Sequence, residues 1–340
     1  MRISVVSNLP ALANVRVPGV EIEFTPYQRY GVTRSELLRT LWRSRACDYA
    51  VINSSGVDLL VFCLFKLVWP FGRCKVISLD TVLPVPRTDS VRDRAGLWLK
   101  RFLFKQAHLF IEYFKETEGY ERHYGIPREK FRYVPFKINR YETVLRTPTS
   151  DAGYVFCGGN TRRDFGTLIA AARTLPFPFR IVTMGNAIIN ENGSTLDERG
   201  LPPNVDVVRH DGSDSFLSHI AASRLVALPI RKQNISASGI GVYLASMALG
   251  KCVVISEGPA VNGIVPEGAA VLVPPEDPAA LAAAIERVYT DDDFRQSTAE
   301  RGKTYALSLK GEERLCESVI DVLAADRGTS GAGLTAAYGR

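Results

Sequence analysis

The sequence predicts an α/β protein with two doubly wound parallel sheets, each in its own domain. Short runs rich in β-branched residues alternate with helical patterns along most of the chain, which is typical of a parallel sheet covered on both faces. With 340 residues, the chain is too long for one small core. A polar stretch without a hydrophobic period, residues 141–151, separates the two halves and predicts a linker.

The first domain is expected over residues 1–140. Its predicted strands cover residues 2–7, 20–24, 48–53, 74–80, 108–113 and 131–134. Helical patterns lie between them at 34–45, 57–67, 91–105 and 115–124. Ligands of doubly wound sheets bind at the carboxyl ends of the strands, so we expect a site in a cleft between the two sheets.

The second domain, residues 152–325, repeats this alternation. Its strands are predicted at 154–157, 179–184, 205–209, 225–228, 252–255 and 270–273. Its helices are predicted at 165–175, 213–222, 242–249, 278–289 and 292–308. The tail at 326–340 is rich in glycine, alanine, serine and threonine, and we expect it to be disordered.

Composition excludes several classes of protein. The six cysteines show no C-x-x-C spacing and the four histidines no ligand spacing, so we expect buried free thiols and no metal site. The first residues, MRISVV, are typical of a strand rather than of a signal peptide. The longest apolar run, residues 57–71, is too short and too interrupted to span a bilayer. We therefore expect a cytoplasmic protein, either free or peripheral on the inner face of the plasma membrane.

Charge is distributed unevenly. Residues 1–140 hold 23 Lys and Arg against 13 Asp and Glu, a net of +10, whereas the remainder holds 19 against 23, a net of −4. A basic first half attracts phosphates, an anionic bilayer or nucleic acid. Because the sequence has no RNA- or DNA-binding module, we expect no nucleic-acid partner.

One predicted helix, Val91–Lys105, mixes cations with large apolar residues. Arg94, Arg101 and Lys105 share a face at seven- and four-residue spacing, and Trp98 lies among them. A basic amphipathic helix of this kind suits docking on an anionic membrane. The alternative is that its apolar side packs on the sheet and its cations are solvated.

Two turns of small residues predict a diphosphate site in the second domain. The run GGNTRR at 158–163 follows one buried strand, and SASGIG at 236–241 precedes a helix. Backbone N–H groups at a helix start lack internal partners and carry partial positive charge, so an anion fits there. Each run has a simpler reading, as a strand-to-helix turn or an ordinary helix cap.

Four stretches of the second half resemble glycosyltransferase family 4, the glycosyl transferases group 1. ASMALGKCVVIS at 245–256 is similar to the family's LEAMALGKPVI, and GAAVLVPPEDPAAL at 268–281 to its G-x-LVPPGDPxAL. Residues 291–306 and the strand-turn at 156–159 also resemble the family. In the first half only GYERHYGIPREKFRYVP, residues 119–135, does so. The resemblance implies the GT-B architecture of two Rossmann-like domains, a nucleotide-sugar donor on the second, and sugar transfer with retention and without a metal or other cofactor.

Two departures from the family concern the donor site. Two glutamates that contact the donor sugar and the ribose in the family align with Ala237 and Ala245. The family's Gly-Arg diphosphate clamp becomes Gly158-Gly159, and we expect Arg162 or Arg163 to replace its arginine, because a guanidinium grips a diphosphate in a fork.

The predicted site follows from these patterns and the resemblance. Asp80, which ends a strand of the first domain, is expected on the acceptor side as a base or positioning group, and Arg163 is the second catalytic candidate; a helix cap is the alternative for Asp80. Solvated or surface-loop roles are the alternatives for Lys232 and His210. The donor-binding candidates are Gly158, Gly159, Asn160, Arg162, Arg163, Gly185, His210, Lys232, Ser236, Ser238, Gly239, Ile240, Gly241 and Glu257.

The expected function is transfer of a hexose from a nucleoside-diphosphate donor to a glycan or lipid-linked acceptor in cell-surface polysaccharide or glycolipid biosynthesis. The alternative is a GT-B-shaped protein that has lost catalysis and acts as a binding or scaffold partner in polysaccharide assembly.

Overall fold

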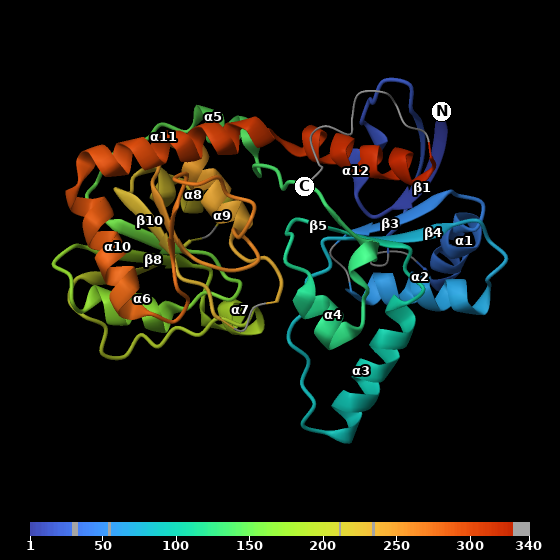
Figure 1. The fold of residues 1–340 in the computed structure, drawn as a ribbon, viewed down its shortest axis with the longest axis horizontal. Coiled ribbons are helices and arrows are strands. Elements are labelled where there is room, and N and C mark those ends of the chain that lie inside the picture. The colour runs from blue at the N-terminus through green and yellow to red at the C-terminus, as the bar shows by residue number, and fades with distance from the viewer. Residues whose placement is uncertain (29–32, 54–55, 211, 233–234, 329–340) are drawn as a thin grey trace. The chain divides into compact units, whose positions relative to one another are not determined.

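The computed structural model describes residues 1–28, 33–53, 56–210, 212–232 and 235–328. The chain forms two compact units (Figure 1). Unit 1 comprises Met1–Pro135 and the chain from Glu313 onward, and unit 2 is Phe136–Glu312. Within the described residues, no helix combines the length and the apolar character that crossing a membrane requires.

Unit 1 contains a six-stranded parallel sheet in the order β2-β1-β3-β4-β5-β6. Its strands are β1 Arg2–Ser7, β2 Glu21–Pro26, β3 Tyr49–Asn53, β4 Lys75–Leu79, β5 Leu109–Glu112 and β6 Phe131–Tyr133. Its helices are α1 Arg34–Ser44, α2 Gly56–Val68, α3 Val91–Phe104, α4 Glu118–Tyr124 and α12 Glu312–Asp326, with 3₁₀ turns η1 Pro10–Ala13 and η2 Arg128–Lys130.

Unit 2 contains a second parallel sheet in the order β12-β11-β10-β7-β8-β9. Its strands are β7 Val155–Gly158, β8 Phe179–Thr183, β9 Val205–Arg209, β10 Leu225–Leu228, β11 Val253–Ser256 and β12 Val271–Val273. Its helices are α5 Tyr141–Arg146, α6 Phe165–Ala172, α7 Asn186–Glu191, α8 Ser213–Ala221, α9 Ile240–Ala248, α10 Pro278–Thr290 and α11 Asp292–Leu309. The strand order reverses between β7 and β10, which is where doubly wound sheets bind ligands.

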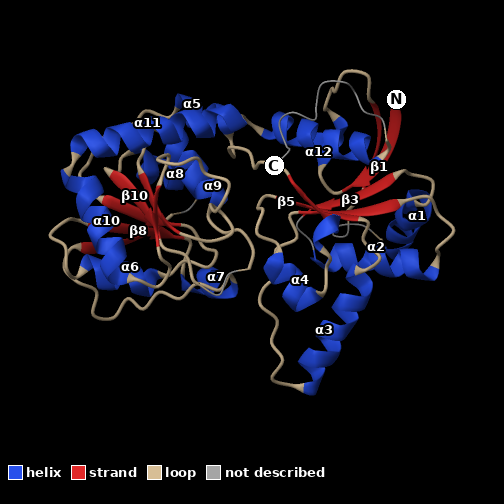
Figure 2. Cartoon of the chain, in the orientation of Figure 1, coloured by secondary structure: helices blue, strands red, loops and turns tan. Residues whose placement is uncertain are grey.

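Helices cover both faces of the second sheet (Figure 2). On one face, Val155 and Cys157 of β7 join a core with α6 and α10 that is almost free of solvent contact. On the other face, Phe156 packs edge-on against Phe216 of α8, with 5.5 Å between ring centroids. Burial on both faces explains why these strands read as continuous apolar runs. All six cysteines are buried and free, as expected.

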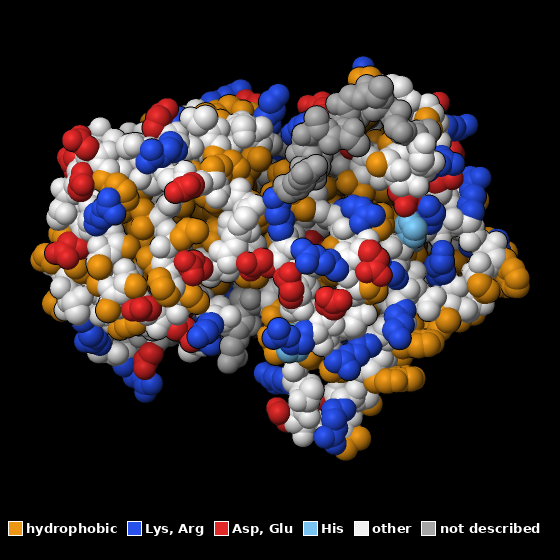
Figure 3. Space-filling model, viewed as in Figure 1, with side chains coloured by type: hydrophobic (Ala, Val, Ile, Leu, Met, Phe, Trp, Pro, Cys, Tyr) orange, Lys and Arg blue, Asp and Glu red, His pale blue; other side chains and the backbone are white. Residues whose placement is uncertain are grey.

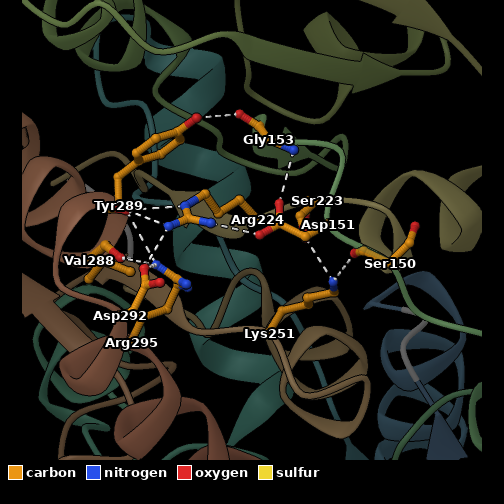
Figure 4. A network of polar contacts seen from close by, with 10 residues as sticks. All are labelled: Ser150, Asp151, Gly153, Ser223, Arg224, Lys251, Val288, Tyr289, Asp292 and Arg295. Carbon is orange, nitrogen blue, oxygen red and sulfur yellow. Dashed lines mark hydrogen bonds and ion pairs between the residues drawn. The ribbon is translucent and has the colours of Figure 1, made fainter.

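A polar network holds together the end of this sheet at which its strands begin (Figure 4). Arg224, just before β10, donates to the Tyr289 carbonyl and forms ion pairs with Asp151 and Asp292 at 2.8 and 2.7 Å. Lys251, just before β11, donates to the carbonyls of Ser150 and Ser223 at 2.7 Å each. These bonds connect the segment that leads into β7 with the residues just before β10 and β11. Structural contacts therefore occupy the end of the sheet at which its strands begin.

The sequence placed most elements correctly but missed three helices. α5 lies inside the predicted linker at 141–151, and α7 follows β8. The predicted second domain, 152–325, includes most of α12, but this helix belongs to unit 1, where the Tyr49 hydroxyl donates to the Leu323 carbonyl at 3.1 Å. The predicted tail began at 326, but Asp326 ends α12 and binds unit 1; residues 329–340 of that tail lie outside the described residues.

Candidate donor-binding site

The turn after β7 buries an arginine. Gly159 adopts a φ of +102°, and the backbone then doubles back so that Arg163 pairs with Ile230 beyond β10. The Arg163 side chain is only 2% exposed. Its Nε donates to the Gly158 carbonyl at 2.8 Å and its Nη1 to the Thr161 carbonyl at 3.0 Å. No carboxylate in the described part of the chain forms an ion pair with this guanidinium.

Two glycines make room for that guanidinium. A Cβ on Gly159 would lie 2.8 Å from Nη2 of Arg163, and a Cβ on Gly239 would lie 3.3 Å from Nη1. Both glycines have a positive φ, +102° and +91°, which residues with a side chain rarely adopt. The turns after β7 and β10 therefore meet at Arg163, although 76 positions separate Arg163 from Gly239 in the chain.

The second turn leads directly into α9. Gly239 is its N-cap residue and offers no side chain to the N–H groups of the first turn. By contrast, the start of α6 is already capped, since the Asp164 carboxylate accepts from the Thr167 N–H at 3.1 Å. Of these two helix starts, the α9 start combines a turn without a side-chain cap with a buried cation beside it, and such a start favours an anion.

A cavity of about 390 Å³ opens over Arg163 within unit 2. Its volume lies within the range of small-molecule sites. One part of its wall is polar and backbone-rich, and the other part is apolar. The lining residues are Asn139, Arg140, Val144, Gly159, Asn160, Thr161, Arg163, His210, Ser213, Phe216, Leu217, Ile220, Gly239, Gly241, Val242 and Ala245.

The electrostatics of the cavity favour an anion. Burial lowers the pKa of Arg163 to about 10, yet the side chain remains protonated at neutral pH. A buried cation without a counter-ion costs free energy, and a bound anion would compensate for that cost. Arg140 adds a second cation at the rim, where it pairs with Asp214 at 2.6 Å.

An aromatic pair forms part of the wall. The His210 ring lies 4.9 Å from the Phe216 ring, and His210 Nδ1 lies 3.1 Å from the Gly212 carbonyl. The two rings are inclined at 55°, and the face of either ring can pack against a nucleobase or a sugar ring.

Six of the predicted donor-binding residues line this cavity: Gly159, Asn160, Arg163, His210, Gly239 and Gly241. Gly158 does not; a Cβ there would lie 2.5 Å from the Phe156 ring and 2.8 Å from the Phe216 ring, so the absence of a side chain lets these rings pack. Of the two candidate arginines, only Arg163 reaches the cavity.

The other candidates lie outside the lining. Lys232 and Glu257 are exposed, and Gly185 is the N-cap of the short helix α7. Ser236, Ser238 and Ile240 are buried beside the α9 start. In unit 1, Asp80 follows β4 with a φ of +53°. Its charge adds to the effect of burial in raising the pKa of Glu112 of β5. The candidates outside the lining are Gly158, Arg162, Gly185, Lys232, Ser236, Ser238, Ile240, Glu257 and Asp80.

A further wall of the cavity is formed by residues that the sequence analysis does not single out. Asn139, Arg140 and Val144 come from the segment at and before α5, next to and inside the predicted linker. Asn139 lies close to the α9 start, with its Nδ2 2.8 Å from where a Gly241 Cβ would be. Two adjacent polar residues before a short apolar pattern are the only signal here, and many surface turns share it.

The strand orders of the two parallel sheets, with helices on their faces, correspond to the GT-B fold. Residues 152–291, in unit 2, match the family model of the glycosyl transferases group 1, which confirms the resemblance found in the sequence. No curated protein matches the chain significantly in sequence.

Solved structures share the fold along nearly the whole chain. A sucrose-phosphate synthase from Thermosynechococcus elongatus has a TM-score of 0.65 at 15% identity, covering 97% of this chain and 100% of that one. Anabaena HepE in complex with UDP and glucose has 0.64 at 14%, covering 95% and 100%. A glycosyltransferase from Rickettsia africae has 0.65 at 11%, covering 97% and 99%. At these identities the likeness concerns the fold.

Proposed function

We propose that the protein transfers a sugar from a nucleoside-diphosphate donor to a glycan or lipid-linked acceptor, with retention of anomeric configuration. The observation that carries this proposal is Arg163, a buried guanidinium without a carboxylate partner in the described residues, facing a 390 Å³ cavity beside the start of α9. The diphosphate would lie against Arg163 and the α9 backbone, and the nucleoside against the His210–Phe216 wall.

In this reaction the bond between the anomeric carbon and the diphosphate oxygen breaks, and a bond to the acceptor oxygen forms. The acceptor hydroxyl gives up its proton, and the nucleoside diphosphate leaves with the bonding electrons. Arg163 would stabilise the negative charge that develops on the diphosphate, which is why we propose that no metal is needed. Asp80 remains our candidate on the acceptor side.

The proposed setting is polysaccharide or glycolipid synthesis at the cytoplasmic face of the plasma membrane. The basic character of the first 140 residues supports an acceptor held at an anionic surface. The HepE structures contain UDP and UDP-glucose, so UDP is the first nucleotide to test.

The test compares thermal stabilisation by UDP, GDP, ADP, CDP and dTDP. A ligand that binds only the folded chain stabilises it by about 2.7 kcal/mol at one hundred times its Kd. We expect at least one diphosphate to raise Tm, and Arg163→Gln to weaken its binding by about 1.5–3 kcal/mol. Arg163→Lys, which keeps the charge, should fold and bind with intermediate affinity.

Two variants control for loss of an arginine as such. Arg162→Gln changes the neighbour that does not line the cavity, and Arg173→Gln changes an exposed residue bound to the Gly200 carbonyl. Both should bind the nucleotide like the unmodified chain. If no diphosphate shifts Tm, or if Arg163→Gln binds normally, the proposal fails.

A second candidate function is binding without turnover. Ala245 presents a methyl group to the cavity, at the position where the resemblance implies a ribose-binding glutamate. Incubation with UDP-sugars and a cell extract as the source of acceptors separates the two functions. Release of UDP supports the transferase, and saturable nucleotide binding without release supports the binding protein.

A further inference from the structure

The three tryptophans of the chain all lie on the surface of unit 1. Trp42, Trp69 and Trp98 are 51%, 39% and 66% exposed. Tryptophan usually buries its large apolar ring, and it is enriched at membrane–water interfaces, where the ring packs among lipids and the N–H stays hydrated. Three such residues in one unit therefore indicate a surface made for a partner.

α3 has two apolar sides. Leu97, Leu103 and Phe104 are buried against unit 1, which accounts for its packing. Val91, Trp98 and Phe102 form a second stripe, at spacings of seven and four residues, that remains exposed. The Trp98 and Phe102 rings stack, with 5.8 Å between centroids. Packing on the unit thus leaves an apolar side of α3 exposed, as docking on a membrane would require.

A second exposed cluster lies at α1 and at the end of α2. The Trp42 and Trp69 rings lie 5.2 Å apart, and Phe71 packs edge-on against Trp69 at 6.3 Å. Phe71 is 89% exposed, and Leu64 and Val68 of α2 extend the cluster. The Arg45 guanidinium lies 3.1 Å from the Trp42 ring centroid, so a cation accompanies the aromatic rings.

The two clusters belong to neighbouring helices, because α2 packs against α3. Figure 3 shows hydrophobic side chains along the edge of unit 1 that these helices form, with lysine and arginine beside them. We call this set the tryptophan surface; its members are Trp42, Leu64, Val68, Trp69, Phe71, Val91, Trp98 and Phe102. Large apolar residues gathered on neighbouring helices, rather than scattered singly, mark an interaction site.

Charge identifies the partner. Arg94 and Arg101 lie four and three positions from Trp98, on the same side of α3. Neither they nor Lys105 forms an ion pair with any described residue. Cations beside exposed aromatic rings complement an anionic lipid surface, where headgroups meet the charges and acyl chains receive the rings.

We propose that unit 1 binds the surface of an anionic bilayer through the tryptophan surface. Trp98 and Phe102 enter the interface from α3, and Trp69 and Phe71 enter it from the end of α2. Arg94 and Arg101 meet the lipid phosphates. This inference goes beyond the proposed transferase, since it concerns residues outside the nucleotide cavity and holds with or without sugar transfer.

The fluorescence of the chain tests this directly, because all its tryptophans lie in the tryptophan surface. Vesicles of phosphatidylcholine with 30% phosphatidylglycerol are titrated without nucleotide, and then vesicles of phosphatidylcholine alone. We expect a blue shift and quenching by brominated lipid with anionic vesicles, weakened by salt. Trp98→Ser combined with Phe102→Ser should lower the partition coefficient about tenfold or more. Arg94→Gln combined with Arg101→Gln should lower it about fivefold per charge.

Leu145→Ser, which removes an exposed apolar residue of unit 2, is the matched control and should bind vesicles normally. Unchanged Tm and UDP binding in every variant would show that folding and the cavity are intact, so a failure here is distinct from a failure of the proposed function. Three results overturn the inference: no vesicle binding, equal binding to neutral vesicles, or a concentration-dependent dimer that the Trp98 and Phe102 changes abolish.

Discussion

The guanidinium of Arg163 lies against the backbone of Gly159, so closely that a Cβ on this glycine would be 2.8 Å from Nη2. Nε of the same guanidinium donates to the carbonyl of Gly158, one residue earlier. The backbone of the turn after β7 thus positions the Arg163 guanidinium. The orientation of Arg163 toward the cavity depends on the absence of a side chain at position 159.

Gly159→Ala should therefore abolish binding of nucleoside diphosphates. The added methyl group would displace Arg163, and the φ of +102° would strain the backbone by about 1–2 kcal/mol. Titration calorimetry with UDP measures the first effect and urea unfolding the second. Gly258→Ala is the matched control, because Gly258 has a φ of +148° with no atom within 4 Å of its Cβ position. It should lose stability but not affinity; equal affinity in both variants would contradict the assigned role of Arg163.

Glu112 predicts a pH dependence of stability in unit 1. Burial, and then the charge of Asp80, raises the pKa of Glu112 well above 4.5. Its Oε1 accepts from the Thr81 N–H at 3.3 Å, and Oε2 has no hydrogen-bond partner among the described residues. The folded state favours the protonated carboxylic acid of Glu112, and this preference stabilises the fold fully below about pH 4.5. The stabilisation is lost as pH rises through the folded pKa, by up to about 1.4 kcal/mol per pH unit.

Glu112→Gln should remove that dependence, since the amide keeps the Oε1 acceptor and never ionises. The free energy of unfolding in urea, measured at pH 5 and pH 8, should change less with pH than in the unmodified chain, and the variant should gain relative stability at pH 8. Glu118→Gln, at an exposed residue that pairs with Arg128, should leave the pH profile as it is. A Glu112→Gln profile parallel to that of the unmodified chain would disprove the buried neutral acid.

Asp326 predicts a pH dependence of stability with the opposite sign. Burial raises its pKa, but the bonds from Lys75, His108 and Tyr49 outweigh burial and lower the pKa to about 2. A lowered pKa contributes stability above the unfolded value of 3.8, and that stability is lost as pH falls toward 2. We expect Asp326→Asn to cost about 1–2 kcal/mol at pH 7 and roughly a third of that at pH 2.5, allowing for solvent screening.

The same change should loosen the end of α12, because Asp326 joins this helix to β4 through Lys75 at 2.6 Å. Hydrogen exchange over residues 315–326 should accelerate in Asp326→Asn. Glu317→Gln, which affects only the local pair with Arg314, is the control on the same helix. Unchanged exchange in Asp326→Asn would mean that other contacts hold α12 in place.

Much of the fold was predictable because its signals are local. Each buried strand of unit 2 is an apolar run, and the residues that end it, such as Gly158 and Gly159, have the small side chains that a strand-to-helix turn requires. The predicted helices do not include α12, and the predicted second domain includes its residues, because local sequence does not show which sheet a segment packs against. Tertiary contacts from Tyr49 and Lys75 make that choice.

The candidate site likewise has features that the sequence predicts and features that depend on tertiary contacts. The sequence determined the two glycine-rich turns, the cationic character nearby and the basic α3 with its tryptophan, since residue type and spacing alone specify these. Only the tertiary structure decided that Arg163 rather than Arg162 enters the cavity, that Asn139 and Arg140 complete its wall, and that α3 keeps an apolar side exposed. The physical reason is that direction and burial depend on neighbours distant in sequence: a left-handed turn at Gly159 orients one arginine inward, and a second turn 80 residues later gives it space.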